Sequence, residues 1–234
     1  MFKIFIAAAI ATGALAVNFV GASAPASSIS PDEALKKLMD GNKRYMNGEL
    51  TLAQRSTSES RKSLATSQSP STIILSCSDS RVPPELLFDQ GLGEIFVVRV
   101  AGNIPDPVIL GSIEYAAEHL GSSLIVVLGH ERCGAVKATV DSKGRGHGNI
   151  GAIVKTISPA LKVALQSCAA CEDDKKCADT KKAAFVECVI DANVKMVAAN
   201  LTRKSKVLRH LTEQKKIRIV SGKYDLDNGK VTLY

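Results

Sequence analysis

The sequence contains no tryptophan, and aromatic residues make up only 4% of its 234 residues. Proteins that bind single-stranded nucleic acid combine a basic groove with aromatic side chains on which bases stack. Here the 30 Lys and Arg residues are interspersed with 23 Asp and Glu residues, apart from short clusters such as Lys215 and Lys216. The net charge of +7 therefore predicts a solvated basic surface and no nucleic-acid partner.

The chain also lacks the glycine motifs that bind nucleotide phosphates. The glycine-rich segment 142–148 contains neither a G-x-G-x-x-G nor a Walker spacing, and it does not connect a strand to a helix. His147 lies in this segment, where a solvated side chain is expected. We therefore assign no chemistry to the segment.

The first 24 residues are typical of a secretory signal peptide. Lys3 gives a minimal positive start, residues 4–20 are almost all apolar, and Ala22-Ser-Ala24 offers a cleavage site, with Ala24-Pro-Ala26 as an alternative. The apolar run is at the short limit for a membrane span and no charged stop-transfer segment follows it. No cysteine precedes Cys77, which argues against a lipoprotein. We expect residues 25–234 to form one exported domain, periplasmic or secreted, with no membrane partner after leader removal.

From residue 31 onward, helix and strand patterns alternate. A capping box at Ser30 and Glu33 predicts a helix to about residue 47, and residues 51–70 are expected to form a loop with at most one short helix. Buried-strand patterns cover residues 73–76, 95–100, 124–129 and 216–221. Helices are predicted over 107–120, 136–140 and most of 150–214, with breaks near Pro159 and between residues 168 and 179. A turn at 227–229 precedes a last strand at 231–234. This alternation predicts an α/β fold in a single domain, with a central, mostly parallel sheet flanked by helices and an antiparallel C-terminal edge strand.

Two of the buried-strand patterns end in side chains that bind metal ions. The first strand is followed by Cys77, with Asp79 and Arg81 close behind, and the third is followed by His130-Glu-Arg-Cys133. Open α/β sheets bind ligands at the carboxyl ends of their strands. Two cysteines and one histidine are three zinc ligands, and a catalytic zinc keeps its fourth position open. A single buried Cys would more often be a small core residue, but the repeated arrangement favours a metal site.

These motifs resemble those of the β-class carbonic anhydrases, whose signature is C-x-D-x-R followed some fifty residues later by H-x-x-C. The segment Arg99-Val-Ala-Gly102-Asn103 is also similar to a family segment, and the resemblance covers about residues 33–234. It implies one Zn²⁺ per chain, held by Cys77, His130 and Cys133, with Asp79 and Arg81 as catalytic residues. It also implies a homodimer or a higher even oligomer, and it leaves an anion-binding role for Arg99 open.

The activity that the resemblance implies is the reversible hydration of carbon dioxide to bicarbonate and a proton, a lyase reaction. Zinc-bound hydroxide would attack the substrate, and Asp79, kept ionised and aimed by Arg81, would orient the hydroxide. One alternative is a hydrolase of carbon disulfide or carbonyl sulfide on the same scaffold. A less favoured alternative is a non-enzymatic zinc or thiol protein of the cell envelope, against which the presence of Asp79 and Arg81 argues.

The four remaining cysteines are crowded into 21 residues, at positions Cys168, Cys171, Cys177 and Cys188. In an exported protein such a cluster favours two disulfides over a second, structural zinc. Four cysteines allow three pairings, and the sequence does not choose among them.

Overall fold

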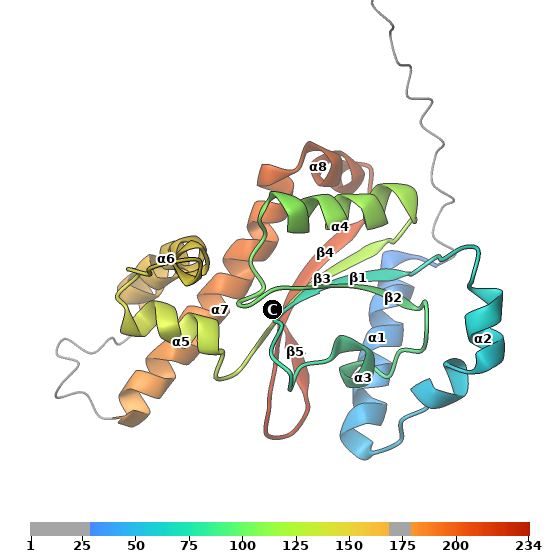
Figure 1. Cartoon of the computed structure of the whole chain (residues 1–234), viewed down its shortest axis with the longest axis horizontal. Coiled ribbons are helices and arrows are strands. Elements are labelled where there is room, and N and C mark those ends of the chain that lie inside the picture. Colours follow the sequence, from blue (N-terminus) through green and yellow to red (C-terminus); the bar gives the residue numbers. More distant parts are fainter. Residues whose placement is uncertain (1–28, 169–178) are drawn as a thin grey trace, which may run out of the picture.

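The computed structural model describes residues 29–168 and 179–234 (Figure 1). The expected signal peptide, residues 1–24, and two of the clustered cysteines, Cys171 and Cys177, lie outside the described residues. Within those two ranges, no helix combines the length and the apolar content needed to cross a membrane.

Five strands form one sheet in the order β2-β1-β3-β4-β5. The strands are β1 (Thr72–Ser76), β2 (Ile95–Arg99), β3 (Leu124–His130), β4 (Arg218–Tyr224) and β5 (Val231–Leu233). Strands β1 to β4 run parallel to one another, and β5 pairs antiparallel with β4. The predicted mostly parallel sheet with an antiparallel C-terminal edge strand is confirmed, although β4 ends three residues later than the pattern indicated.

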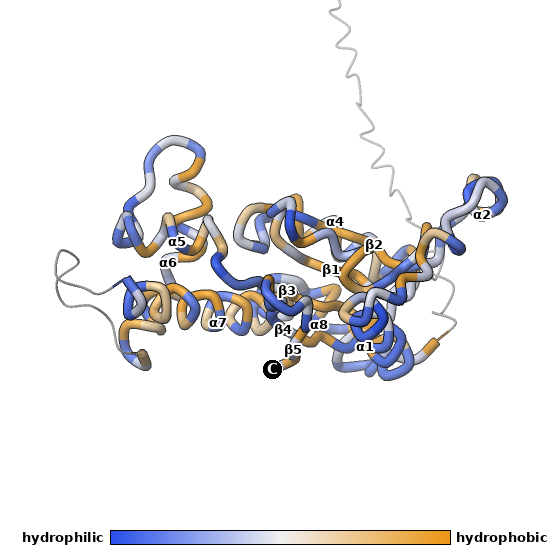
Figure 2. Tube along the Cα trace, turned by 90° about the horizontal axis from the view of Figure 1, so that it is seen from below, coloured by the Kyte–Doolittle hydropathy of each residue, from blue (hydrophilic) through white to orange (hydrophobic). Residues whose placement is uncertain are grey.

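The helices connect the strands and cover the sheet. They are α1 (Pro31–Asn47), the 3-10 helix η1 (Leu52–Arg55), α2 (Ser58–Ser63), α3 (Pro84–Leu87), α4 (Pro107–His119), α5 (Gly134–Asp141), α6 (Ile150–Ser167), α7 (Asp179–Lys204) and α8 (Lys206–Glu213). The predicted capping box begins α1, because Ser30 Oγ accepts from the Glu33 amide and Glu33 accepts from the Ser30 amide. Helix α2 has no buried residue and stands apart from the main body of the molecule (Figure 2).

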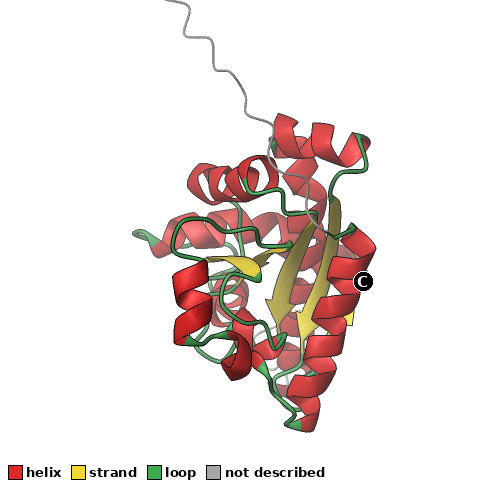
Figure 3. Ribbon diagram, turned by 90° about the vertical axis from the view of Figure 1, so that its right-hand side faces the viewer, coloured by secondary structure: helices red, strands yellow, loops and turns green. Residues whose placement is uncertain are grey.

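The strands β1 and β3 are buried along their whole length because helices pack on both faces of the sheet (Figure 3). Alternate residues of each strand face the two layers of helices on opposite sides of the sheet. Ile73 and its neighbour Ile125 pack with residues of α4, α5, α6, α7 and α8, whereas Ile74 and Val126 pack with α1 and α3. The candidate ligand motifs therefore follow two adjacent, fully buried strands.

The predicted break near Pro159 is wrong, because α6 runs through it without interruption. A proline inside a helix leaves the carbonyl four residues earlier without its usual donor. Here that residue is Lys155, and both Lys155 and Pro159 are exposed. Water can therefore hydrogen-bond to the carbonyl, so the helix continues through the proline.

A disulfide joins the end of α6 to α7, between Cys168 and Cys188. One of the two predicted disulfides is therefore present, and the cysteines of the second, Cys171 and Cys177, lie in the part of the chain that the structure does not describe. Cys77 and Cys133 form no disulfide and are both buried. Their thiols remain available as metal ligands.

Candidate metal centre

The first ligand-bearing loop follows β1 and is held by an arginine from the neighbouring strand. Ser76 at the end of β1 pairs with Arg99 at the end of β2. From there Arg99 donates through Nε to the carbonyl oxygen of Cys77 at 2.9 Å and through Nη2 to that of Asp79 at 2.6 Å. Because both carbonyls are fixed, the Cys77 thiol and the Asp79 carboxylate leave the sheet in defined directions.

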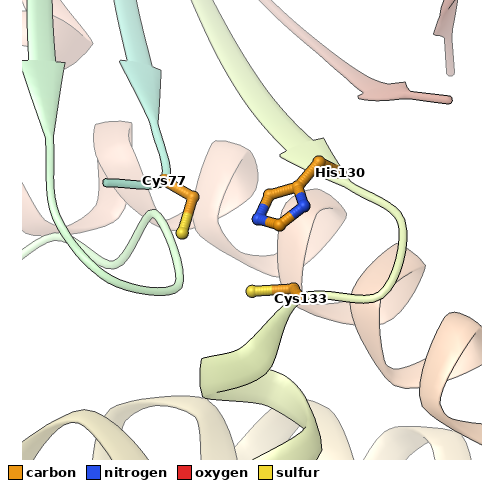
Figure 4. Close-up of side chains that lie close together, drawn as sticks. All are labelled: Cys77, His130 and Cys133. Carbon is orange, nitrogen blue, oxygen red and sulfur yellow. The ribbon is translucent and has the colours of Figure 1, made fainter. Parts of the chain in front are cut away.

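The second loop follows β3, which lies next to β1 in the parallel sheet. His130 is the last residue of β3, and Cys133 is the N-cap residue of α5. Since parallel strands end at the same edge, the two loops meet there, and the ligand atoms of Cys77, His130 and Cys133 all lie within 4.8 Å of one another (Figure 4). The structure thus brings together the three residues that the sequence singled out as metal ligands.

The imidazole of His130 is oriented as a metal ligand. Its Nδ1 lies 2.8 Å from the carbonyl oxygen of Glu131, so Nδ1 carries the proton. Its Nε2 is buried and has no hydrogen-bond partner among the described residues. A buried acceptor without a partner is rare in native proteins, and a metal ion bound at the nitrogen would satisfy it. With two sulfurs beside it, the group can bind a metal ion that accepts thiolate and imidazole.

The two thiols share their protons unequally. The hydrogen bond from the Cys133 thiol lowers the pKa of Cys77 to about 4 despite burial of Cys77. The same hydrogen bond and burial raise the pKa of Cys133. Cys77 is therefore the more acidic of the two thiols, and binding of a cation by both thiolates would release protons. The position of Cys133 at the N-terminus of α5 favours its thiolate as well.

A glycine and an asparagine complete the surroundings of Cys77. The amide of Gly102 donates to Cys77 Sγ at 3.3 Å, and Asn193 of α7 donates to the carbonyl of Gly102 at 3.0 Å. Gly102 has a positive φ of 77°, a conformation in which a residue with a side chain is strained, and a Cβ there would also lie 2.8 Å from Ile157 Cδ1, which would have to shift. Asn193 was not among the residues predicted for the site, although a polar residue beside apolar positions on a long helix was a visible signal.

Asp79 and Arg81 form a two-point ion pair next to the ligands. Arg81 donates through Nε to Asp79 Oδ1 at 2.9 Å and through Nη2 to Oδ2 at 2.8 Å. These hydrogen bonds hold the pKa of Asp79 well below its usual range. Asp79 Oδ2 lies 3.9 Å from His130 Nε2, so an ionised carboxylate lies beside the site that a metal would occupy.

The chain is similar in sequence to known proteins over most of its length. A family model described as carbonic anhydrase matches residues 72–231. The chain is 47% identical over 135 residues to a carbonic anhydrase of Mycolicibacterium smegmatis, covering 56% of this chain and 65% of that protein. It is 33% identical over 204 residues to a carbonic anhydrase of Pseudomonas aeruginosa, covering 84% and 86%. The chain thus spans just under two thirds of the mycobacterial relative and most of the other.

Solved structures show the same architecture. The β-carbonic anhydrase CafA of Aspergillus fumigatus superposes with a TM-score of 0.65 at 25% identity, covering 87% of this chain and 89% of that one. One of two tetrameric β-carbonic anhydrases of Sordaria macrospora gives a TM-score of 0.64 at 22% identity, covering 86% and 94%. The second match shows likeness of fold alone.

Proposed function

The chain belongs to the β-class carbonic anhydrase family, and we propose that it catalyses the reversible hydration of carbon dioxide to bicarbonate and a proton. The observation that carries this proposal is the buried, unpartnered Nε2 of His130 beside two thiols and an ionised carboxylate. No feature of the described residues favours the hydrolysis of carbon disulfide or carbonyl sulfide instead.

We propose that Cys77, His130 and Cys133 hold one Zn²⁺ per chain. Two sulfurs and one imidazole nitrogen suit zinc, and three protein ligands leave a position for water. When bound, zinc makes a water molecule acidic enough to supply a nucleophile near neutral pH. The burial of all three ligands supports the proposal, because a dry site strengthens the attraction between thiolates and a cation.

The proposed roles of Asp79 and Arg81 depend on their ion pair. Because Asp79 is ionised, it can only accept hydrogen bonds. It would accept a hydrogen bond from the attacking oxygen and so turn the lone pair of that oxygen toward carbon dioxide. Arg81 would keep the carboxylate in this orientation through its two donors. If the pair has this function, its presence favours an enzyme over a zinc or thiol protein that lacks catalytic activity.

Two further proposals concern the setting of the enzyme. The leader pattern of residues 1–24 supports export to the periplasm or the medium. The likeness in fold to tetrameric β-carbonic anhydrases supports an assembly of two or four identical chains.

The function is tested by stopped-flow carbon dioxide hydration on purified residues 25–234, with zinc measured on the same samples. The wild type should carry one zinc per chain and hydrate carbon dioxide. The His130→Ala variant should lose both, whereas the matched control His210→Ala, which changes an exposed histidine of α8, should keep both. Full zinc content in His130→Ala would contradict the ligand assignment, and a zinc-loaded wild type without hydration would contradict the activity.

A further inference from the structure

The turn between His130 and Cys133 has a backbone conformation that needs support. Only two residues separate the ligands, and the second of them, Arg132, has a positive φ of 52°. A residue with a Cβ is strained in this left-handed region, because the Cβ approaches the following carbonyl oxygen. Such a conformation persists only when surrounding contacts maintain it. The position of Cys133 relative to His130 therefore depends on what holds Arg132.

A carboxylate from α7 holds the backbone of Arg132. The amide of Arg132 donates to Glu187 Oε1 at 2.7 Å. The other oxygen of Glu187, Oε2, lies 3.4 Å from Nζ of Lys223. Lys223 belongs to β4 and pairs in register with Gly129, the residue before His130. Glu187 thus connects helix α7 with the turn at Arg132 and with strand β4.

Other contacts of the loop act on different groups. The guanidinium of Arg132 forms a two-point pair with exposed Asp227 at 3.0 and 2.9 Å, and the amide of Glu131 donates to the carbonyl of Tyr224. The first contact holds a flexible side chain, and the second fixes the peptide between His130 and Glu131, one peptide before the one that carries the Arg132 amide. The carboxylate of Glu187 accepts from the Arg132 amide itself, through a charge-assisted bond of the stronger kind.

The helix that carries Glu187 is itself anchored at this point. Cys188 follows Glu187 directly, and its disulfide to Cys168 ties this turn of α7 to the end of α6. Further along the helix, Asn193 holds Gly102 and so the environment of Cys77. Helix α7 therefore supports both ligand loops, from positions that are fixed in the fold.

We propose that Glu187 is a positioning residue of the metal centre, which holds the Arg132 turn so that Cys133 and His130 meet the same ion. The inference rests on the proposed zinc site, though not on carbon dioxide as the substrate. Without the carboxylate, the turn relaxes from its left-handed conformation and Cys133 moves relative to His130. The metal then dissociates more readily, because outer groups that orient ligands contribute to metal affinity.

The test compares Glu187→Ala and Glu187→Gln with wild type. Zinc affinity is measured by competition with a chromogenic chelator, and ligand geometry by the absorption spectrum of the cobalt-substituted protein. Glu187→Ala should weaken zinc binding by about 10–100-fold and alter the cobalt spectrum. Glu187→Gln keeps a neutral acceptor for the Arg132 amide and should recover most of the affinity. This rescue separates a positioning role from a general loss of charge.

Asp191→Ala is the matched control. Asp191 lies one turn after Glu187 on α7, and its Oδ1 is 2.8 Å from the same Lys223 Nζ and accepts from the Tyr234 hydroxyl, away from the metal loop. The variant should bind zinc as wild type does. Thermal unfolding of the zinc-free proteins, with chelator present, shows whether Glu187→Ala destabilises the fold more than Asp191→Ala. A loss of affinity in Asp191→Ala equal to that in Glu187→Ala would overturn the inference.

The outcomes also separate this inference from the proposed activity. If Glu187→Ala binds zinc as tightly as wild type, the inference is wrong whether or not carbon dioxide is hydrated. If Glu187→Ala loses affinity while wild type fails to hydrate carbon dioxide, the activity is wrong and the inference stands. A wild type that binds no zinc would overturn both.

Discussion

Around the metal centre, hydrogen bonds from other groups determine where each ligand points. Arg99 fixes the carbonyls of Cys77 and Asp79, and Glu131 orients the ring of His130. An anion bound by Arg99, the role that the family resemblance left open, would have to share the guanidinium with these two carbonyls. The same side chain would then both hold the first ligand loop and sense an anion.

The first prediction concerns Asp79 and Arg81. Asp79→Ala should keep its zinc and lose about 10²–10⁴-fold in hydration rate, the range typical of a positioned acid–base or orienting group. Arg81→Ala should lose a similar amount, because an unpaired Asp79 lies only 3.9 Å from His130 Nε2 and is free to turn toward the metal. The rates are measured by stopped flow, with zinc content determined in parallel.

The double variant of Asp79 and Arg81 provides the internal control. If the two residues act as one unit, the double substitution should cost far less than the sum of the two single losses in free energy. Additive losses, or a wild-type rate in Arg81→Ala, would show that the ion pair is structural.

Among the helices and strands, the elements with strong local signals were predicted from sequence. The capping box located the start of α1, the apolar runs located β1 and β3, and the placement of the ligands followed from those strands. Burial of the remaining residues depended on tertiary packing, which local sequence patterns do not record. On α7, helical spacing from Phe185 and Val189 places Ala192, Met196 and Asn200 on the core stripe. These three residues are only half buried, whereas Asn193 is buried because its side chain donates to the carbonyl of Gly102. That contact joins residues 91 apart in the chain, and no local pattern contains it.

A buried carboxylate joins α1, α3 and the segment between α1 and α2. Asp89 accepts from Arg44 Nε at 2.6 Å and from the amides of Thr51 and Leu52, both at 2.7 Å. Burial alone would raise the pKa of Asp89, but the hydrogen bonds from Arg44 and from Thr51 and Leu52 lower it to about 2. Its folded pKa is thus below the ordinary value of 3.8, and ionised Asp89 stabilises the fold.

The second prediction follows from the lowered pKa of Asp89 in the folded protein. Asp89→Asn should lower the free energy of unfolding at neutral pH by about 3–5 kcal/mol, since it breaks a buried pair. The stabilisation is complete well above the ordinary pKa of 3.8 and is lost as pH falls toward about 2, so the difference between wild type and variant should shrink over that range. Urea unfolding with a chelator present measures this without a contribution from metal release. Asp40→Asn, which removes an exposed ion pair with Lys36, should change stability far less. Equal effects of the two substitutions would contradict the role of Asp89.

For the molecule as a whole, the edge of the sheet formed by β2 is the surface that bears on assembly. Among the described strands, β2 pairs only with β1, and its residues are mostly half-buried. Beside it lie exposed Leu92 and Tyr115, and a groove runs between α2 and the start of β2. An unpaired edge strand next to exposed apolar side chains is a surface that proteins usually cover. Helix α2 has no buried residue and stands on this same side in Figure 1. We therefore expect a second copy of the chain to cover the free edge of β2 together with α2.

The last prediction tests this surface through two leucines with similar exposure. Leu92, beside β2, is 47% exposed, and Leu165, on α6 at the opposite side of the molecule in Figure 1, is 54% exposed. Leu92→Glu places a charge in the expected contact and should weaken self-association at least about tenfold, which corresponds to about 1.4 kcal/mol. Leu165→Glu should leave the assembly unchanged. Sedimentation velocity over a range of concentrations measures both, with wild type expected to contain two or four chains. If Leu165→Glu dissociates the assembly and Leu92→Glu does not, the interface lies on the α6 side, and the free edge of β2 serves another purpose.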